Sequence, residues 1–518
     1  MQTMEEILPV SPDIFAPVIA VIKANREALL TIPGVFGVRP GFSKSNRGED
    51  PVPVIVVVTK PDAGIVPLPE SLEGIPLETE TASPLDLAEG GVIPLSIWEG
   101  YSPEAVPHIN YQPPDPNEVA LTEMDVQHVT CHVGPDSGWT TLQPFLEGTT
   151  TSLTVAMYEF YAAHIIDTIT TLGQERGATL SMILQVDKND RDIADTLSQS
   201  WGERLEFVKA SVSGANRIFN NSYHTKVAVR DSSAFWLSSG NWSPHSQPLI
   251  APGNEQFLYK EGNREWHVII EDGSLAKMYE KFIRYDMRQA IGAVTEEAFF
   301  EPPDLFVPEA LAEAEAAVIQ PQPFAAATFY TNGETVRVKP LMSPDNYAAE
   351  VLKLIEAAEE SLYLQFSYIR QPSTEIFDRI IAAIAQKMED GLDVKVIAGP
   401  SQKAEHSDLL IGTRKWKRNM FRRQSSKVHN KGILIDGKIA VVGSNNWSSD
   451  GTQYNRDTSL VFFSPEIAAY YTAVFMFDWN NLTKPIAHAP EITPLIAGEN
   501  EPAPPGMRRV SWQEWYDA

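Results

Sequence analysis

The feature that most constrains the fold of this chain is an internal repeat. Residues 129–160 resemble residues 338–369, with Pro135-Asp136 matching Pro344-Asp345 and Ser152-Leu153 matching Ser361-Leu362 at one sequence offset. Each copy continues with a helical pattern of apolar residues and then a short apolar run, LSMILQVD or VKVIAGPS. Strand, helix and strand in succession are typical of an α/β layer structure. The repeat therefore predicts two similar α/β halves.

Proline-rich passages separate these halves from the rest of the chain. Near the N-terminus, the pattern predicts a helix from Ile14 to Leu30 and a buried strand in PVPVIVVVTKP. The expected parts are a small α+β domain of unassigned role at 1–105, two α/β halves at 120–300 and 325–485, and a proline-rich tail at 486–518.

Composition limits the class of protein. Hydrophobic residues make up 43% and charged residues 21% of the chain, as in soluble globular proteins. No apolar run reaches the length of about eighteen residues that a transmembrane helix needs. The segment MQTMEEILPVSPDIF lacks the pattern of a secretory signal, so a cytoplasmic location is expected. Cys131 is the single cysteine, which excludes an internal disulfide and a zinc site built from cysteines.

Each half ends in a related motif, HTKVAVRDSSAFWLSSGNWS from His224 or HNKGILIDGKIAVVGSNNWS from His429. A lone histidine in a strand is usually structural. Two copies of the same polar set inside apolar strands indicate function, because burying such groups costs free energy unless they are used. The matched pairs are His224/His429, Lys226/Lys431, Asp231/Asp436, Ser239/Ser444 and Asn241/Asn446.

The spacing in the second motif predicts a β-hairpin. Asp436-Gly437 between two β-branched runs is typical of a two-residue turn, which places His429 opposite Ser444. Residues i and i+2 of a strand share a face, so His429 and Lys431 point the same way, flanked by Ser444 and Asn446.

The first motif predicts an equivalent patch from His224, Lys226, Ser239 and Asn241. The aspartates follow their histidines by an odd number of residues and fall on the opposite strand face. Asp231 and Asp436 are therefore interpreted as turn or support residues.

The two motifs resemble the HxKxxxxD signature of the phospholipase D superfamily, and GSNNWS resembles its downstream GSxN element. The resemblance implies two α/β halves, each a mixed sheet flanked by helices, related by a pseudo-twofold axis with both histidines at the seam. It also implies chemistry that requires no metal ion and no other cofactor.

The residue types suit cleavage of a phosphodiester. That reaction needs a nucleophile, a proton donor for the leaving oxygen and fixed polar or positive groups for the developing charge. By resemblance to the family, His224 is assigned as the nucleophile that forms a phosphohistidine and His429 as the general acid. The predicted groups for the non-bridging oxygens are Lys226, Lys431, Asn241, Asn446, Ser239 and Ser444.

Glu265 in NREWHVII and Asp457 in NRDTSLVF stand where the family places a carboxylate that orients a catalytic imidazole. The alternative interpretation is a surface ion pair with Arg264 or Arg456. Ser238 replaces the glycine of the GSxN element in the first half, so the two halves are expected to differ.

One segment departs from the overall net charge of −27. Residues 414–431, RKWKRNMFRRQSSKVHNK, lack acidic residues and interleave aromatic with basic side chains, a combination that binds nucleic acid. The predicted substrate-binding residues here are Arg414, Lys415, Trp416, Arg418, Arg422 and Arg423. A solvated basic loop is the simpler alternative.

A nuclease acting on DNA or RNA is the leading hypothesis, because the GSNNWS ending resembles nuclease-type members. The alternative is a phospholipase D or phosphatidyltransferase acting on phospholipid headgroups, since a basic and aromatic rim also suits anionic lipid. A third hypothesis is a catalytically inactive binding module. The intact histidines and lysines of both motifs argue against it.

Overall fold

The computed structural model describes residues 16–42, 52–59, 67–81, 109–185, 192–212, 216–220, 222–250, 253, 258–293, 305–308, 323–370, 372–402, 404–486, 495–496, 502–504 and 507–510. The chain divides into two compact units. The smaller contains Met1–Val106, Phe300–Ala314 and Ile492–Asp517, and the larger contains Pro107–Phe299 and Glu315–Glu491. The boundaries predicted at residues 105 and 300 lie outside the described residues.

The smaller unit contains the predicted N-terminal helix and strand. Its elements are α1 (Ala16–Leu30), β1 (Val35–Phe42), β2 (Pro53–Thr59), β3 (Ser71–Leu72) and β4 (Ile75–Thr81), with strand order β1-β2-β4-β3. Val18 and Ile22 of α1 pack with Ile55 and Val57 of β2. A second, three-stranded sheet has β13 (Leu305–Pro308) between β23 (Leu495–Ile496) and β24 (Met507–Val510).

The larger unit contains both repeats. Repeat 1 comprises β6 (Val129–Gly134), α4 (Gly138–Glu147), β7 (Ser152–Met157), α5 (Ala163–Glu175), β8 (Thr179–Leu184), α6 (Ile193–Trp201), β9 (Leu205–Lys209), β10 (Val227–Arg230), β11 (Ala234–Ser238), α7 (Leu258–Glu261), β12 (Glu265–Ile270) and α8 (Gly273–Ala293). Repeat 2 comprises β15 (Val336–Ser343), α10 (Tyr347–Glu356), β16 (Ser361–Phe366), α11 (Glu375–Glu389), β17 (Asp393–Ala398), α12 (Ala404–Gly412), β18 (Phe421–Gln424), β19 (Lys431–Ile435), β20 (Ile439–Gly443), α13 (Ser449–Gln453), β21 (Asp457–Phe463), α14 (Pro465–Asn481) and β22 (Thr483–Pro485).

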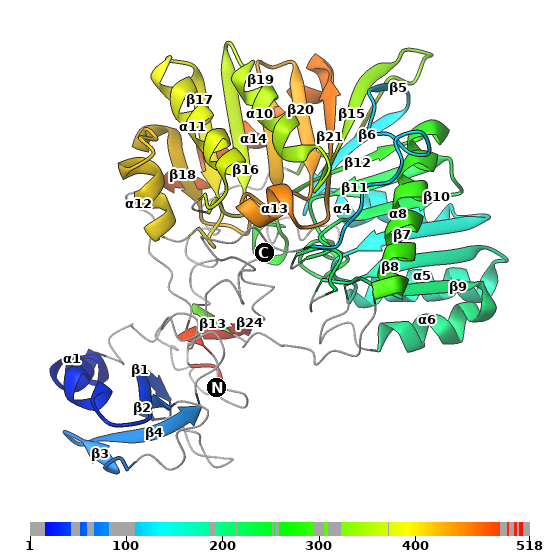
Figure 1. Ribbon diagram of the computed structural model, residues 1–518. Helices are drawn as coiled ribbons and strands as arrows, with labels where there is room; N and C mark the ends of the chain where they lie inside the picture. The colour runs from blue at the N-terminus through cyan, green and yellow to red at the C-terminus, as the bar shows by residue number, and fades with distance from the viewer. Residues whose placement is uncertain are drawn as a thin grey trace, which may run out of the picture. The chain divides into compact units, whose positions relative to one another are not determined.

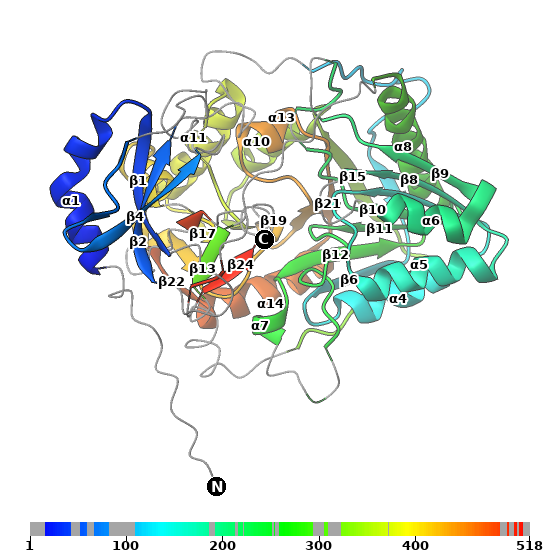
Figure 2. The same ribbon diagram turned by 90° about the horizontal axis from the view of Figure 1, so that it is seen from below.

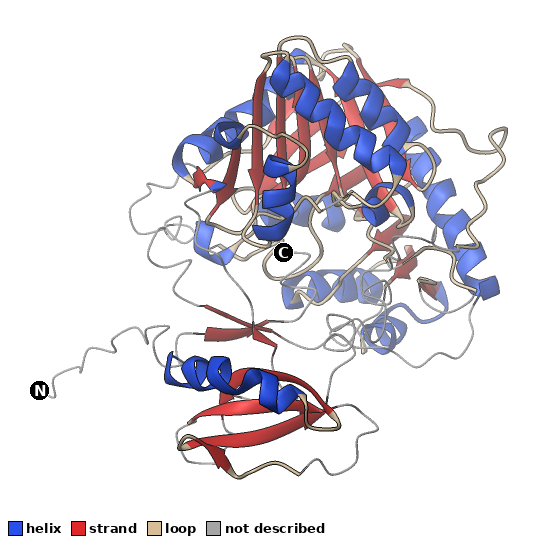
Figure 3. Ribbon diagram, turned by 60° about the vertical axis from the view of Figure 1, so that its left-hand side comes forward, coloured by secondary structure: helices blue, strands red, loops and turns tan. Residues whose placement is uncertain are grey.

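The two repeats share one strand order. Repeat 1 runs β6-β12-β11-β10-β7-β8-β9, and repeat 2 runs β15-β21-β20-β19-β16-β17-β18 in the corresponding positions. Both sheets are mixed, because β7 and β16 pair in parallel with the strand on one side and antiparallel with the strand on the other. The two sheets lie beside each other, with helices along them (Figures 1 and 3). The expected fold of two similar α/β halves is confirmed.

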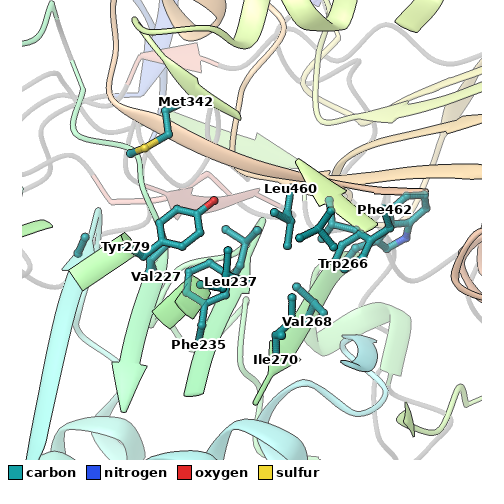
Figure 4. Close-up of a cluster of buried hydrophobic side chains, with 14 of the residues drawn as sticks. Val227, Phe235, Leu237, Trp266, Val268, Ile270, Tyr279, Met342, Leu460 and Phe462 are labelled. Atoms are coloured by element: carbon teal, nitrogen blue, oxygen red, sulfur yellow. The ribbon is translucent and has the colours of Figure 1, made fainter. Parts of the chain in front are cut away.

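Helices cover the outer faces of the sheets, while α8 and α14 contribute to a core shared by both repeats. In repeat 1, α4, α5 and α6 pack on one face of the sheet, as Figure 2 shows from below. The shared core joins Trp266 and Val268 of β12 to Leu460 and Phe462 of β21, which lie together in Figure 4. This continuous apolar layer fixes the position of one repeat against the other.

The strand that precedes each repeat pairs with the sheet of the other. β5 (Met124–Val126) comes just before repeat 1 but pairs antiparallel with β15 of repeat 2. β14 (Ala327–Phe329) comes just before repeat 2 but pairs antiparallel with β6 of repeat 1. The two repeats therefore exchange their leading strands.

Candidate active site

The two motif histidines meet at the seam between the repeats. His224 comes shortly before β10 and His429 shortly before β19, so each lies at the end of an interior strand of its own sheet. Their ring centroids are 6.1 Å apart, and both side chains are buried. The backbone also joins the repeats here, because the His224 N–H donates to the Arg456 carbonyl and the His429 N–H donates to the Arg264 carbonyl. The two sheets thus bring the imidazoles to one place.

Each imidazole is held by a carboxylate from the opposite repeat. His224 Nδ1 lies 2.8 Å from Asp457 Oδ1, and His429 Nδ1 lies 3.1 Å from Glu265 Oε1. Both carboxylates are fully buried at the first residue of β21 or β12, so the alternative of a surface ion pair is wrong. Because each carboxylate occupies Nδ1, the Nε2 atom of each ring is the one available for chemistry.

The neighbouring arginines have other partners. Arg264 is buried and binds Asp136 of its own repeat and Asp478 of repeat 2. Arg456 forms the equivalent network with Asp345 and with a carboxylate on α8, Asp286. These two networks cross the seam on either side of the histidines and tie the repeats together.

The motif lysines lie beside the histidines. Lys226 Nζ donates to the His224 carbonyl at 2.7 Å, and Lys431 Nζ donates to the His429 carbonyl at 2.7 Å. Both ammonium groups are buried. Lys226 Nζ also lies 4.9 Å from the centre of the Tyr158 ring, which gives it a cation–π contact. The site therefore has two fixed positive charges close to the imidazoles.

The two asparagines differ in orientation. Asn446 Nδ2 lies 3.5 Å from His224 Nε2, and Ser367 donates to its Oδ1 at 3.4 Å. Asn241 Nδ2 instead donates to the buried carboxylate of Glu159 at 2.7 Å. As the structure stands, Asn446 presents an N–H group beside the reactive nitrogen of His224, whereas the amino group of Asn241 is engaged by Glu159.

Ser239 and Ser444 were expected to hold phosphate oxygens, but both are bound to the adjacent strand. Ser239 Oγ accepts from the Trp266 N–H, and Ser444 Oγ accepts from the Thr458 N–H. Ser444 also donates to Asp457 Oδ1 at 2.8 Å. Each hydroxyl thus contacts the backbone of the adjacent strand beside one of the two carboxylates, and the predicted substrate contact stays a prediction.

The hairpins form, but their turns are one residue longer than predicted. Ile435 pairs with Ile439 and Arg230 with Ala234, so three residues form each loop. Asp231 and Asp436 have positive φ angles and accept hydrogen bonds from backbone N–H groups that begin the neighbouring strand, at Thr150–Ser152 and Glu359–Ser361. These bonds lower the pKa of Asp231 to about 2 against the opposing effect of burial. The aspartates act as turn and support residues.

The basic segment does not form the predicted rim. Trp416 and Phe421 are buried in the core of repeat 2, and Trp416 Nε1 donates to the Ile381 carbonyl, so neither ring is available to stack on a base. β16, β17 and β18 run parallel, and β19 runs antiparallel to β16. His429 therefore lies at the end of the sheet where β18 finishes. Residues 414–420 precede β18 and lie at the opposite end of these strands.

The individual basic side chains follow the same pattern. Arg414 binds Asp378 at 2.7 Å, Arg422 lies over the Trp479 ring, and Arg423 is buried against the Gln402 carbonyl. Lys415 and Arg418 are exposed. The prediction of substrate binding at Trp416 and Arg423 is wrong because both side chains are buried, while the prediction for the partly exposed Arg414 stays a prediction. The exposed Lys415 and Arg418 fit the simpler interpretation of a solvated loop.

Burial sets the protonation of the site. The pKa values of His224 and His429 lie well below the ordinary value, first because both rings are buried and then because Lys226 and Lys431 are close. Burial also raises the pKa of Glu265 to about 8, against the opposing effects of the Ser246 hydroxyl and Lys431. At neutral pH the pair therefore shares one proton between the carboxyl group of Glu265 and Nδ1 of His429.

Sequence reasoning missed several residues of the site. Tyr158 packs edge-on against His224, with ring centroids 4.8 Å apart, and Glu159 follows it. Ser246 donates to Glu265 Oε1 at 2.8 Å, and His267 lies behind the same carboxylate. The first two follow a buried strand that the repeat had identified, so their position was the available signal. His267 follows Glu265 by two residues on β12, a spacing that places both on one strand face, whereas Ser246 carried no signal.

Two kinds of feature are absent from the described residues. These residues include no helix that is long and apolar enough to cross a membrane. They also include no cluster of three or more histidine, cysteine or acidic side chains placed to hold a metal ion.

Comparison with known proteins places these repeats in a family. A family model described as "Cardiolipin synthase, PLD-like domain" matches residues 142–287 and 351–479, more than half of the chain. A search of curated proteins found no match.

Solved structures similar to this chain include three bacterial proteins. Phosphatidylserine synthase of Haemophilus influenzae is 14% identical with a TM-score of 0.47, over 69% of this chain and 89% of that chain. The phospholipase D family member Nuc of Salmonella typhimurium is 20% identical with a TM-score of 0.24, over 28% and 95%. Polyphosphate kinase of Porphyromonas gingivalis is 10% identical with a TM-score of 0.43, over 92% and 81%.

Proposed function

Because this chain belongs to the phospholipase D superfamily, we propose that it is a metal-independent phosphodiesterase that works through a phosphohistidine on His224. The observation that carries the proposal is the crossed pairing of the two imidazoles with Asp457 and Glu265. Two histidines with separate carboxylates, facing each other across one seam, supply a nucleophile and a proton donor for a single phosphate.

In the first step, His224 Nε2 attacks phosphorus while the bond to the leaving oxygen breaks. Asp457 accepts the Nδ1–H group of His224, which keeps the lone pair on Nε2. The Glu265–His429 pair releases its proton from His429 Nε2 to the leaving oxygen. Lys226 and Lys431 stabilise the negative charge on the non-bridging oxygens.

In the second step, water attacks the phosphohistidine, and His429 Nε2 accepts a proton from that water. The phosphorus–nitrogen bond breaks and its electron pair returns to His224 Nε2. An alcohol in place of water turns the same step into transfer of the phosphoryl group. Nothing in these two steps uses a metal ion.

Two substrate classes fit this chemistry. The nuclease hypothesis loses one of its two arguments, since the aromatic residues of segment 414–431 are buried. Its remaining support is the GSNNWS sequence, in which Trp447 is itself buried and Ser448 begins α13 as its N-cap. The description of the matching family model favours phospholipid headgroups or phosphatidyl transfer. We therefore treat nucleic acid and phospholipid as the two arms of one experiment.

The test compares purified protein on bis(4-nitrophenyl) phosphate, single-stranded DNA, RNA and anionic phospholipid vesicles, each with excess chelator. We expect cleavage of the artificial diester and of one natural class, with a covalent phosphohistidine trapped by rapid acid-free denaturation. Loss of all activity in chelator contradicts the mechanism, and activity on one natural class alone decides the substrate.

A further inference from the structure

Repeat 1 contains a second buried histidine behind the carboxylate that holds His429. His267 Nε2 lies 3.9 Å from Glu265 Oε2, while Glu265 Oε1 binds His429 and Ser246. Oε2 has no hydrogen-bond partner among the described residues. Glu265 thus lies between two imidazoles, one from each repeat. The two-step mechanism above uses only one of them.

Ser238 determines which nitrogen of His267 carries the proton. Its hydroxyl oxygen accepts from the Gly240 N–H at 2.7 Å and lies 2.6 Å from His267 Nδ1. With one acceptor site occupied by Gly240, the arrangement that uses the hydroxyl proton is donation to Nδ1. The ring proton of neutral His267 then lies on Nε2, the nitrogen on the side of Glu265 Oε2.

The glycines around this group leave room for it. A Cβ atom on Gly240 would lie 1.6 Å from Glu265 Oε2, and a Cβ atom on Gly134 would lie 3.1 Å from His267 Nε2. Any larger residue at position 240 would therefore displace the carboxylate from its position between the rings.

Repeat 2 has no such histidine. The positions that correspond to Ser238 and His267 are Gly443 and Ser459, and Ser459 donates to Asn445. His132, whose ring centroid lies 4.7 Å from that of His267, corresponds to Leu341. The second imidazole is therefore specific to the carboxylate that serves His429.

We propose that His267 is a positioning residue that acts through Glu265 to make His429 the proton donor. This inference rests on the function proposed above. When His429 gives its proton to the leaving oxygen, the proton shared with Glu265 moves to the ring and negative charge develops on the carboxylate. The Nε2–H group of His267 stabilises that charge at a buried position, where a fixed dipole is effective.

Other groups around Glu265 are already committed. Against burial, the Ser246 hydroxyl, Lys431, the Asn263 side chain and Lys226 favour its charged form by lowering its pKa. His132 and burial keep His267 itself neutral, so it acts as a dipole and not as a cation. Without His267, the pair holds its proton more tightly and becomes a weaker acid.

The test uses two substitutions that each keep one nitrogen position of the imidazole. In His267→Gln the amide nitrogen replaces Nε2, and in His267→Asn it replaces Nδ1. The first-turnover rate is measured with diphenyl phosphate, whose phenolate leaving group needs a proton, and with bis(4-nitrophenyl) phosphate, whose leaving group does not. The double variant Ser238→Gly/His267→Ser copies the pair found in repeat 2 and covers the case in which His267→Asn fails to fold.

We expect His267→Asn to slow diphenyl phosphate cleavage about tenfold or more, as for loss of one electrostatic donor. Cleavage of bis(4-nitrophenyl) phosphate should change less than about twofold, and His267→Gln should restore most of the lost rate. The alkaline limb of the pH profile should move to higher pH, because the pair loses its proton less readily. His132→Leu, which changes the far side of His267, serves as the control.

Equal losses on both substrates, or no loss in either variant set, overturn the inference while leaving the proposed function intact. A wild-type protein that cleaves neither diester overturns both. The two failures are therefore distinguishable within one experiment.

Discussion

His224 and His429 occupy equivalent places in two similar repeats, yet their carboxylates are held differently. Asp457 is short, and its Oδ1 atom accepts from both His224 and the hydroxyl of Ser444. That hydroxyl also accepts from the backbone of the same strand, which leaves Asp457 little freedom. This arrangement suits a ring whose tautomer must stay fixed.

Glu265 is one methylene longer and has a titratable neighbour on its other side. His267 lies beyond Oε2, and burial raises the pKa of the carboxyl group to about 8. A carboxyl group that changes its charge near neutral pH suits a ring that must release and recover a proton. The two repeats place the histidines equivalently, and the residues around each carboxylate suit one histidine to act as the nucleophile and the other as the acid.

The largest effect is expected from the histidines themselves. His224→Asn should lower activity on every diester by at least ~10³-fold, since no nucleophile remains. His429→Asn should do the same for diphenyl phosphate but leave a measurable first-turnover burst with bis(4-nitrophenyl) phosphate. Steady-state and rapid-quench assays in chelator measure both. The reverse pattern would exchange the roles of the two histidines.

Substitutions of the two carboxylates should distinguish the roles of His224 and His429 in the same way as substitutions of the histidines. Asp457→Asn removes the acceptor that fixes the His224 tautomer and should cost ~10²–10⁴-fold with either leaving group. Glu265→Gln cannot supply a proton, so its loss should be concentrated on diphenyl phosphate. Circular dichroism and thermal unfolding check that both variants fold. Identical losses for the two variants would show that the carboxylates have one common role.

The arginine networks should be equally important to stability, although the carboxylates they flank differ. Replacing either buried arginine by methionine leaves two buried carboxylates without their partner. We expect Arg264→Met and Arg456→Met each to cost about 3–5 kcal/mol of unfolding free energy. Urea unfolding followed by tryptophan fluorescence measures this cost. A loss below ~1 kcal/mol in one repeat only would show that the seam is anchored from one side.

A smaller difference should appear in the acid dependence of stability. Burial lowers the pKa of His132 to about 3, so between pH 6.5 and that value only the unfolded chain takes up this proton. Stability is therefore lost as pH falls through this window, by about 1.4 kcal/mol per pH unit for this group. His132→Leu, which copies Leu341, should reduce the slope by that amount. An unchanged slope in urea titrations from pH 6 to 4 contradicts it.

The smallest effect is expected at the exposed basic residues of the 414–431 segment. Lys415→Glu and Arg418→Glu should change kcat/KM on any diester by less than about twofold. They should also leave the salt dependence of kcat/KM unaltered, because both residues lie at the end of the strands opposite His429. The assay is repeated across a range of salt concentrations. A marked fall in the salt dependence of kcat/KM on nucleic acid would support the predicted role of segment 414–431 in binding nucleic acid.

The repeat made much of the fold predictable, because matched residues in two copies reveal the polar groups that the fold must bury at one place. The same signal identified His224 and His429, and the resemblance to the family identified Glu265 and Asp457. It did not reveal which carboxylate holds which histidine, since that depends on how the repeats pack and not on spacing.

The errors have physical causes too. Trp416 looked like a stacking residue because basic side chains surround it in sequence, yet alternation along a short segment does not distinguish a ring that packs inward from one that faces solvent. The turn at Asp436 is one residue longer than predicted, and the Asp436 side chain binds the start of the neighbouring strand β16, a contact that spacing within the motif does not reveal. His267 was missed although it follows Glu265 by two residues on the same strand, β12, a spacing that places both side chains on one face.

The exchange of leading strands has a consequence for how this protein can be divided. A fragment that ends at Ala293 lacks β14, so β6 presents an open row of backbone donors and acceptors. A fragment that begins at Ala327 carries β14 but lacks β5, and it leaves β15 open in the same way. Each fragment carries the strand that the other needs. Separately produced halves should therefore aggregate or seek each other, and mixing them should rebuild a two-chain protein with both histidines in place.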